Sequence, residues 1–198
     1  MPYAPERVFP LRPVDTFRWL WGPEPFRFDG RYYRANDANV PAPVQRPEPP
    51  LVLAGAGEKV TLRQVARLAD MANFGPGPAG GVDTPEQARH KHEILKRHCD
   101  EFGRPYEDIL CSLFTHWVMV APTEREVADK VSRYFPNGLD EFWGKYLIAG
   151  TPEQIVELFQ AYADAGVQHF DCQVLDAEDV ETFTLLMQQV GPSLSRTR

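Results

Sequence analysis

After residue 50 the spacing of apolar and polar positions changes from one segment to the next, which predicts alternating strands and helices. Short apolar runs predict strands at residues 51–54, 71–74, 109–120, 146–148 and 168–174. Apolar residues recurring every three or four positions predict helices at residues 62–69, 85–102, 127–135, 155–162 and 180–187. Such alternation is typical of a parallel sheet with right-handed crossovers. Both a doubly wound sheet and part of a (β/α)₈ barrel fit this order.

Several helix ends carry sequence signals of their own. Thr84 and Thr151 each begin the sequence Thr-Pro-Glu-Gln, in which threonine is the N-cap, proline the first helical residue and glutamine the partner in a capping box. Thr123 is followed three residues later by a glutamate, which predicts a similar start. Gly103 and Gly166 stand where left-handed C-caps are expected.

The first 50 residues have a different pattern. Residues 14–21 form a short amphipathic stretch, and aromatic runs on both sides of Asp29-Gly30 predict a β-hairpin with a type I′ turn. Residues 41–50 contain five prolines, which predict an extended connector. We therefore expect two parts: residues 1–50 with a helix, a hairpin and the connector, and residues 51–198 with the α/β domain.

Composition narrows the choice of partners and location. The 198 residues carry 21 Lys and Arg against 28 Asp and Glu, a formal net charge of −7, and no basic run occurs. This balance argues against binding to nucleic acid or to an anionic membrane surface. The three cysteines have no metal-ligand or disulfide spacing, and we expect them to be buried. Without a signal peptide or an 18-residue apolar run, the expected location is the cytoplasm.

A glycine-bearing turn is the first candidate for chemistry. Ala54-Gly55-Ala56-Gly57-Glu58 joins a predicted strand directly to a predicted helix. Small residues let backbone N–H groups approach a ligand, and a helix start adds partial positive charge, so the turn suits a phosphate. A tight strand–helix turn needs glycine in any case. The turn is not a dinucleotide fingerprint, because Val60 stands where the third small residue is required.

Histidines and tryptophans give weaker signals. His92 lies on an apolar helix face, where a core position is the commoner explanation. His116 and His169 lie in predicted strands, where inward-facing side chains can contact a ligand. The charges of residues 86–107 are interpreted as a solvated helix face. The four tryptophans are interpreted as core or interface residues rather than cofactor contacts: Trp19, Trp21, Trp117 and Trp143.

The order of several segments resembles the luciferase-like monooxygenases, in particular the branch that depends on the deazaflavin F420. The segments that carry the resemblance are residues 28–33, 43–50, 51–59, 61–63, 69–70, 73, 90–104, 150–154 and 165–167. These segments are spread over most of the chain, and several motifs in one order are more specific than any single motif.

The resemblance implies a (β/α)₈ barrel that binds F420, as first choice, or FMN at the carboxyl ends of its strands and acts on a small organic substrate. It implies that the backbone of residues 54–58 (Ala54, Gly55, Ala56, Gly57 and Glu58) holds the cofactor phosphate. Asn73 would approach the cofactor ring or have a structural role. The family's Gly-Gly pair at the turn is Gly55-Ala56 here, a mild change if Ala56 keeps a negative φ.

The match covers only the C-terminal half of such a barrel, about four parallel strands with their helices, preceded by a hairpin arm. No acid–base residue can be transferred from the family, because the first four strands have no counterpart. A half barrel leaves two strand edges and an inner face uncovered. We therefore expect a homo-oligomer or a complementary N-terminal half chain. The alternative function is a non-catalytic homologue or subunit that acts as a scaffold or binds a partner.

Overall fold

The computed structural model describes residue 21 and residues 26–29, 34–38, 40–45, 48–77 and 80–194. The chain divides into two compact units, residues 1–51 and 52–198, which are described separately. The predicted amphipathic stretch at residues 14–21 lies outside the described residues, apart from Trp21.

The first unit contains a two-stranded antiparallel sheet of β1 (Phe26–Asp29) and β2 (Arg34–Ala38). Asp29 pairs with Arg34, so residues 30–33 separate the strands. The hairpin is confirmed, but the prediction of a two-residue turn at Asp29-Gly30 is wrong. Tyr32 and Tyr33, the aromatic residues that were assigned to the second strand, lie outside the described residues.

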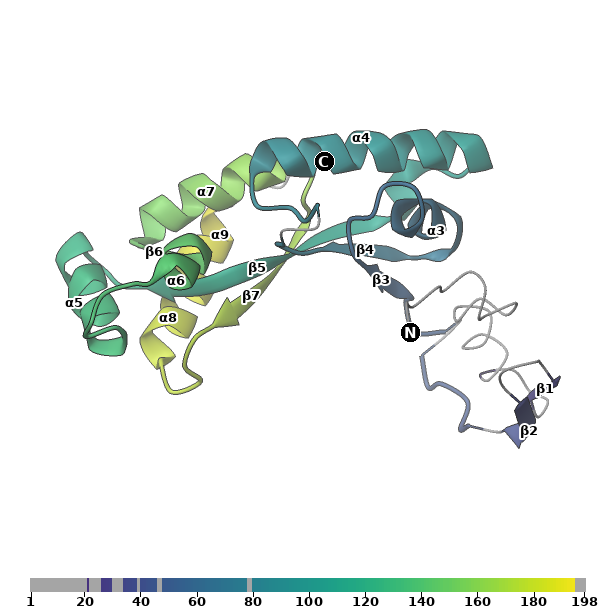
Figure 1. The fold of residues 1–198 in the computed structure, drawn as a ribbon, viewed down its shortest axis with the longest axis horizontal. Coiled ribbons are helices and arrows are strands. Elements are labelled where there is room, and N and C mark those ends of the chain that lie inside the picture. Colours follow the sequence, from purple (N-terminus) through teal and green to yellow (C-terminus); the bar gives the residue numbers. More distant parts are fainter. Residues whose placement is uncertain are drawn as a thin grey trace. The chain divides into compact units, whose positions relative to one another are not determined.

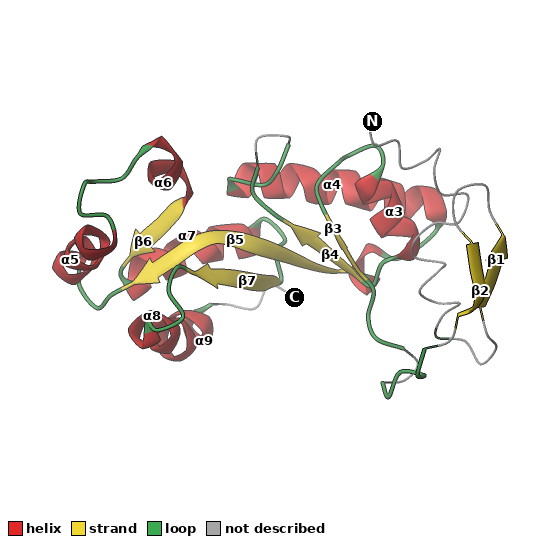
Figure 2. Ribbon diagram, turned by 60° about the horizontal axis from the view of Figure 1, so that its bottom comes forward, coloured by secondary structure: helices red, strands yellow, loops and turns green. Residues whose placement is uncertain are grey.

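The second unit is built on a parallel sheet, drawn in Figures 1 and 2. Its strands are β3 (Val52–Ala54), β4 (Met71–Phe74), β5 (Leu110–Val120), β6 (Leu147–Gly150) and β7 (His169–Val174). β3, β4, β5 and β7 pair in chain order. Because residues 112–113 pair with both β4 and β7, these two strands lie on opposite edges of β5.

β5 is the longest of the strands given above, and it pairs with different strands along its two halves. Its first half pairs with β4, and residues 117–120 pair with the short strand β6 on the same edge. The register against β7 shifts between Phe114 and Trp117, which marks a β-bulge. The strand therefore continues beyond the end of β4, and the bulge reorients the side chains of residues 115 and 116.

The helices begin and end where their capping residues predict. The helical segments are α3 (Thr61–Leu68), α4 (Pro85–Phe102), η1 (Tyr106–Asp108), α5 (Glu124–Tyr134), α6 (Glu141–Tyr146), α7 (Pro152–Asp164), α8 (Val180–Leu185), η2 (Leu186–Val190) and α9 (Gly191–Ser193). Thr84 and Thr151 form complete capping boxes, and Thr123 accepts from the Glu126 N–H. Gly103 is a left-handed C-cap with φ +64°, and Gly166, just beyond the end of α7, has φ +113°.

Two helical details departed from the sequence pattern. The six-residue α6 was not predicted, because it is too short to show a period, although Asp140 accepts from the Trp143 N–H as its N-cap. The predicted last helix continues past Leu185 as a π-helical turn, η2.

The two faces of the sheet differ in cover. α3, α4 and α7 lie on one side of the strands, and the outward side chains of the strands form the core there (Figure 2). That core includes Ala72, Phe74, Cys111 and Leu113. On the opposite, inner face, Val52, Leu110 and Phe114 are 47%, 42% and 40% exposed. The core of a half barrel therefore lies between sheet and helices, and the inner face keeps apolar side chains in contact with solvent.

Candidate functional site

The predicted phosphate-binding turn follows β3 at its carboxyl end. Gly55 has a φ of +121°, and its N–H donates to the Asn73 carbonyl at 2.9 Å, so it turns the chain while staying attached to β4. Within the described part of the chain, the N–H groups of Ala56, Gly57 and Glu58 donate no hydrogen bond. Three consecutive amides at the end of β3 therefore have no acceptor among the described residues, and runs of such amides are known to bind anions.

Ala56 fits this turn without strain. Asp37 is the single residue other than glycine with a positive φ among those described, so Ala56 does not need the left-handed conformation. Its side chain is 9% exposed and packs into the core, whereas Gly57 beside it is exposed. A Cβ at Gly57 would lie 3.0 Å from the Thr61 hydroxyl, so the turn has little room for a side chain at this position.

A buried lysine reaches the same turn from α4. Lys91 is 7% exposed, and its Nζ donates to Glu58 Oε1 at 2.7 Å. His90 Nε2 lies 3.3 Å from the same oxygen. The hydrogen bond from Lys91 is the main reason why the pKa of Glu58 is below its usual value. The interpretation of residues 86–107 as a solvated face is therefore wrong for Lys91. The spacing of apolar residues could not predict the burial of Lys91, because a lysine counts as polar in such a pattern wherever its side chain lies.

Asn73 takes part in a polar network on the inner face rather than in the turn. Its Nδ2 donates to Ser112 Oγ and to Asp171 Oδ2, both at 2.7 Å. His169 Nε2 lies 3.2 Å from Asp171 Oδ1. Four side chains from three neighbouring strands thus meet next to Ala54, which pairs with Asn73 in the register of β3 and β4. Sequence reasoning named Asn73 and His169 but missed Ser112 and Asp171.

The loop after β4 is tied to β5. Asp83 Oδ1 accepts from the Gly77 N–H at 3.3 Å and lies 3.3 Å from His116 Nε2, within the bulge of β5. Burial lowers the pKa of His116, although the carboxylate of Asp83 opposes that shift. A Cβ at Gly81 would lie 2.3 Å from the Gly77 nitrogen, so this loop requires glycine there. His116 therefore holds a loop at the strand ends instead of facing open solvent.

The other sequence candidates are structural. His92 is 3% exposed, and its Nδ1 lies 2.6 Å from the Tyr106 hydroxyl, as expected for a core position. Trp117 and Trp143 pack edge to face at 5.1 Å within an aromatic cluster that includes Phe142. Trp19 lies outside the described residues.

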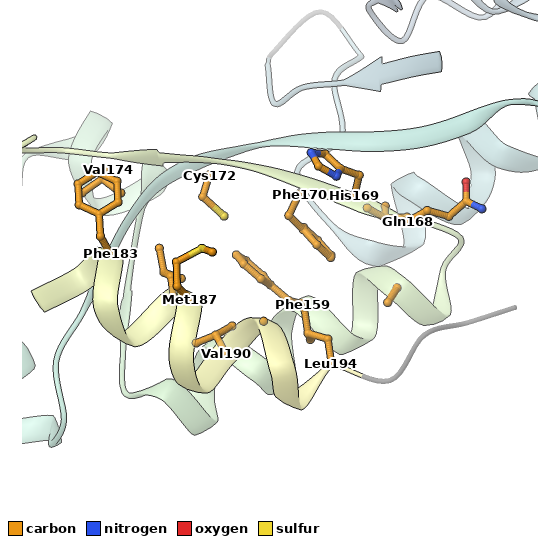
Figure 3. A pocket seen from close by; sticks show the side chains of 14 residues that line it. Phe159, Gln168, His169, Phe170, Cys172, Val174, Phe183, Met187, Val190 and Leu194 are labelled. Atoms are coloured by element: carbon orange, nitrogen blue, oxygen red, sulfur yellow. The ribbon is translucent and has the colours of Figure 1, made fainter. Parts of the chain in front are cut away.

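A separate groove of about 690 Å³ lies on the outer side of β7, between α7 and the helical segments that follow β7 (Figure 3). Its lining is mostly apolar and includes Phe170, Cys172, Phe183 and Met187. Burial raises the pKa of Cys172 to about 11, which keeps this thiol unreactive. The groove does not include the glycine turn, and His169 is the one member of the polar network among its lining residues.

Among the described residues, no group of three or more His, Cys, Asp and Glu side chains could hold a metal ion. None of the helices in that part of the chain is long and apolar enough to cross a membrane.

Comparison with known proteins identifies the family. The sequence pattern of the luciferase-like monooxygenases matches residues 14–139, which is more than half of the chain. The chain therefore belongs to the luciferase-like monooxygenase family, as the sequence motifs predicted. It is 24% identical over 221 aligned residues to an F420-dependent glucose-6-phosphate dehydrogenase of Kribbella flavida. That alignment covers 98% of this chain but 64% of the relative.

Solved structures agree on the fold. An F420-dependent secondary alcohol dehydrogenase in complex with an F420–acetone adduct gives a TM-score of 0.69 at 16% identity, covering 92% of this chain and 60% of the other. A second similar structure is the oxygenating constituent of 3,6-diketocamphane monooxygenase from Pseudomonas putida in complex with FMN. Its TM-score is 0.62 at 16% identity, and the match covers 93% of this chain and 62% of the other. The predicted partial (β/α)₈ barrel is confirmed, and the chain spans less than two thirds of these relatives.

Proposed function

We propose that this chain is the cofactor-binding half of a luciferase-like oxidoreductase, which holds the phosphate of F420, or of FMN, at residues 54–58. The supporting observation is a set of three amides at the carboxyl end of β3, on Ala56, Gly57 and Glu58, that have no acceptor in the part of the chain that the structure describes. Lys91 adds a positive charge at the last residue of the turn, where its Nζ donates to Glu58. These donors suit an anionic cofactor tail.

F420 is the first choice of cofactor, and FMN is the second. Two relatives of this chain, one from Kribbella flavida and one from Segniliparus rotundus, are both named F420-dependent glucose-6-phosphate dehydrogenases. Among the structural neighbours, the diketocamphane enzyme is described in complex with FMN. When bound, either cofactor would supply hydride transfer or oxygen activation toward a small organic substrate.

The protein groups placed near the cofactor would position and polarise it. Asn73 is held by Ser112 and Asp171 on the inner face, so its amide is fixed in direction beside the turn. His169 Nε2 lies 3.2 Å from Asp171 Oδ1, so an imidazole stands beside this amide. We infer no complete set of acid–base residues from this chain alone.

Exposed apolar side chains in the second unit indicate which partner this chain binds. Exposed Val52, Leu110 and Phe114 on the inner face, with Phe183 and Met187 at the groove, favour a homo-oligomer or a complementary N-terminal half chain. Multi-angle light scattering on the 22.5 kDa chain tests this, and a stable monomer that unfolds cooperatively would contradict it. We expect no nucleic-acid or membrane partner and a cytoplasmic location.

The direct test of the function is titration of the purified protein with F420 and with FMN, followed by cofactor fluorescence. We expect binding at roughly micromolar concentrations, tighter for F420. A folded protein that binds neither cofactor would exclude the cofactor site and leave the non-catalytic scaffold as the remaining function.

A further inference from the structure

One ion pair at the glycine turn differs from an ordinary surface salt bridge. The side chain of Lys91 is 8% exposed, whereas that of Glu58, its partner, is 42% exposed. Lys91 donates to Glu58 alone within the described residues. A buried ammonium needs an anionic or polar acceptor, because burying it without one is costly. The lysine is therefore fixed, while its partner is free to move into water.

The carboxylate belongs to the turn itself. Glu58 is the last residue of the turn, so its carboxylate is attached by a single side chain to the backbone that carries the turn amides. His90 Nε2 approaches the same Oε1 at 3.3 Å, so two nitrogen groups converge on one carboxylate oxygen. A Cβ at Gly80, in the loop after β4, would lie 3.9 Å from Lys91 Nζ, an ordinary van der Waals contact, so this loop packs against the ammonium.

We propose that Lys91 is a phosphate-binding residue of this site and that Glu58 is an internal anion which the phosphate of the cofactor displaces. The inference rests on the proposed function and adds two roles to it. In the free protein, Glu58 satisfies Lys91. When the phosphate binds, its oxygens accept from Lys91 and from the turn amides, and the half-exposed carboxylate turns toward solvent.

Opposite effects of two substitutions distinguish this role from a structural one. Lys91→Met removes a charged donor to the phosphate and should weaken FMN binding by about tenfold or more. Glu58→Gln removes the competing anion and should strengthen FMN binding by about threefold to tenfold. If the pair only held α4 against the turn, both substitutions would weaken binding or neither would change it.

Matched controls isolate the phosphate. Lys96→Met removes the same charge from α4 at a position where the ammonium lies over the Tyr106 ring, and FMN binding should stay at the wild-type level. Lys91→Arg keeps the charge and should keep most of the affinity. Riboflavin, which lacks the phosphate, should bind weakly and equally to all variants. Thermal unfolding checks that each variant is folded.

The outcomes separate the two proposals. If wild-type protein binds neither F420 nor FMN, both the proposed function and this inference are wrong. If the wild type binds FMN but Lys91→Met binds it as well as Lys96→Met does, the cofactor site stands and the role of Lys91 is excluded. Weaker binding after Glu58→Gln would exclude the displacement by phosphate.

Discussion

Lys130 and Lys91 are both helical lysines with buried side chains, but their surroundings differ. Lys130 Nζ donates to Asp179, to the Val120 carbonyl and to the Thr182 hydroxyl at 2.8, 2.9 and 3.2 Å. Both side chains of the Lys130–Asp179 pair are 7% exposed. Among the described residues Lys91 has one acceptor, and the side chain of that acceptor is 42% exposed. Equal burial of the lysine therefore does not mean an equal role.

The difference indicates how a structural charge can be distinguished from a charge available to a ligand. Lys130 joins α5 to the end of β5 and to the start of α8, and each of its donors has a protein acceptor. Burial alone would raise the pKa of Asp179, but hydrogen bonds from Lys130 and Thr182 outweigh it and lower the pKa. Lys91 instead donates to the half-exposed carboxylate of Glu58, which we propose a phosphate can replace. A buried lysine whose donors all have protein acceptors stabilises the fold, whereas a buried lysine with a half-exposed partner can bind an anionic ligand.

The largest expected effect is on Lys130. Lys130→Met leaves Asp179 buried without its cation, so we expect the free energy of unfolding to fall by about 3–5 kcal/mol. Urea denaturation followed by circular dichroism measures it. A loss below about 1 kcal/mol would mean that the network around Asp179 does not stabilise the packing of α5 and α8.

The next effect concerns His92, which follows Lys91 on α4 but faces the core. Burial lowers its pKa to about 4, with a smaller contribution from the charge of Lys96. The folded protein favours the neutral imidazole of His92. The fold therefore has its full stability above the unfolded pKa of about 6.5, and it loses stability as the pH falls toward 4, because the unfolded chain then takes up the proton more readily. The full loss amounts to about 3 kcal/mol.

The measurement is the free energy of unfolding of wild type and His92→Gln between pH 7 and pH 4. Glutamine keeps a partner for the Tyr106 hydroxyl and does not titrate. We expect the wild-type curve to fall more steeply over this interval. Parallel curves would show that His92 does not carry the pH dependence.

The smallest expected effect is on the stability contributed by Lys91. Lys91→Met keeps the apolar stem and leaves Glu58 at a surface where water can solvate it. The free energy of unfolding should therefore change by less than about 1 kcal/mol. The same denaturation experiment serves as the measurement. A loss as large as that of Lys130→Met would remove the distinction between the two pairs.

The sequence predicted the local parts of this fold well. Helix starts at Thr84, Thr123 and Thr151 were readable because N-caps depend on residues only three apart. Hairpin register and the short helix α6 were not readable, because neither leaves a period long enough to recognise. In the site, the glycine turn could be found from contiguous residues, whereas Ser112 and Asp171 are separated from Asn73 by 39 and 98 positions.

By itself, the sequence determined the family, the alternation of strands and helices, and the position of the turn, since each is encoded by neighbouring residues or by the order of motifs. Only the tertiary structure decided which charges are buried and what they contact. Lys91 and Lys130 look alike in the sequence, and only their burial and acceptors separate them. Parallel strands bring together residues that are far apart in the chain, so the partners of a charged side chain depend on how the whole sheet pairs.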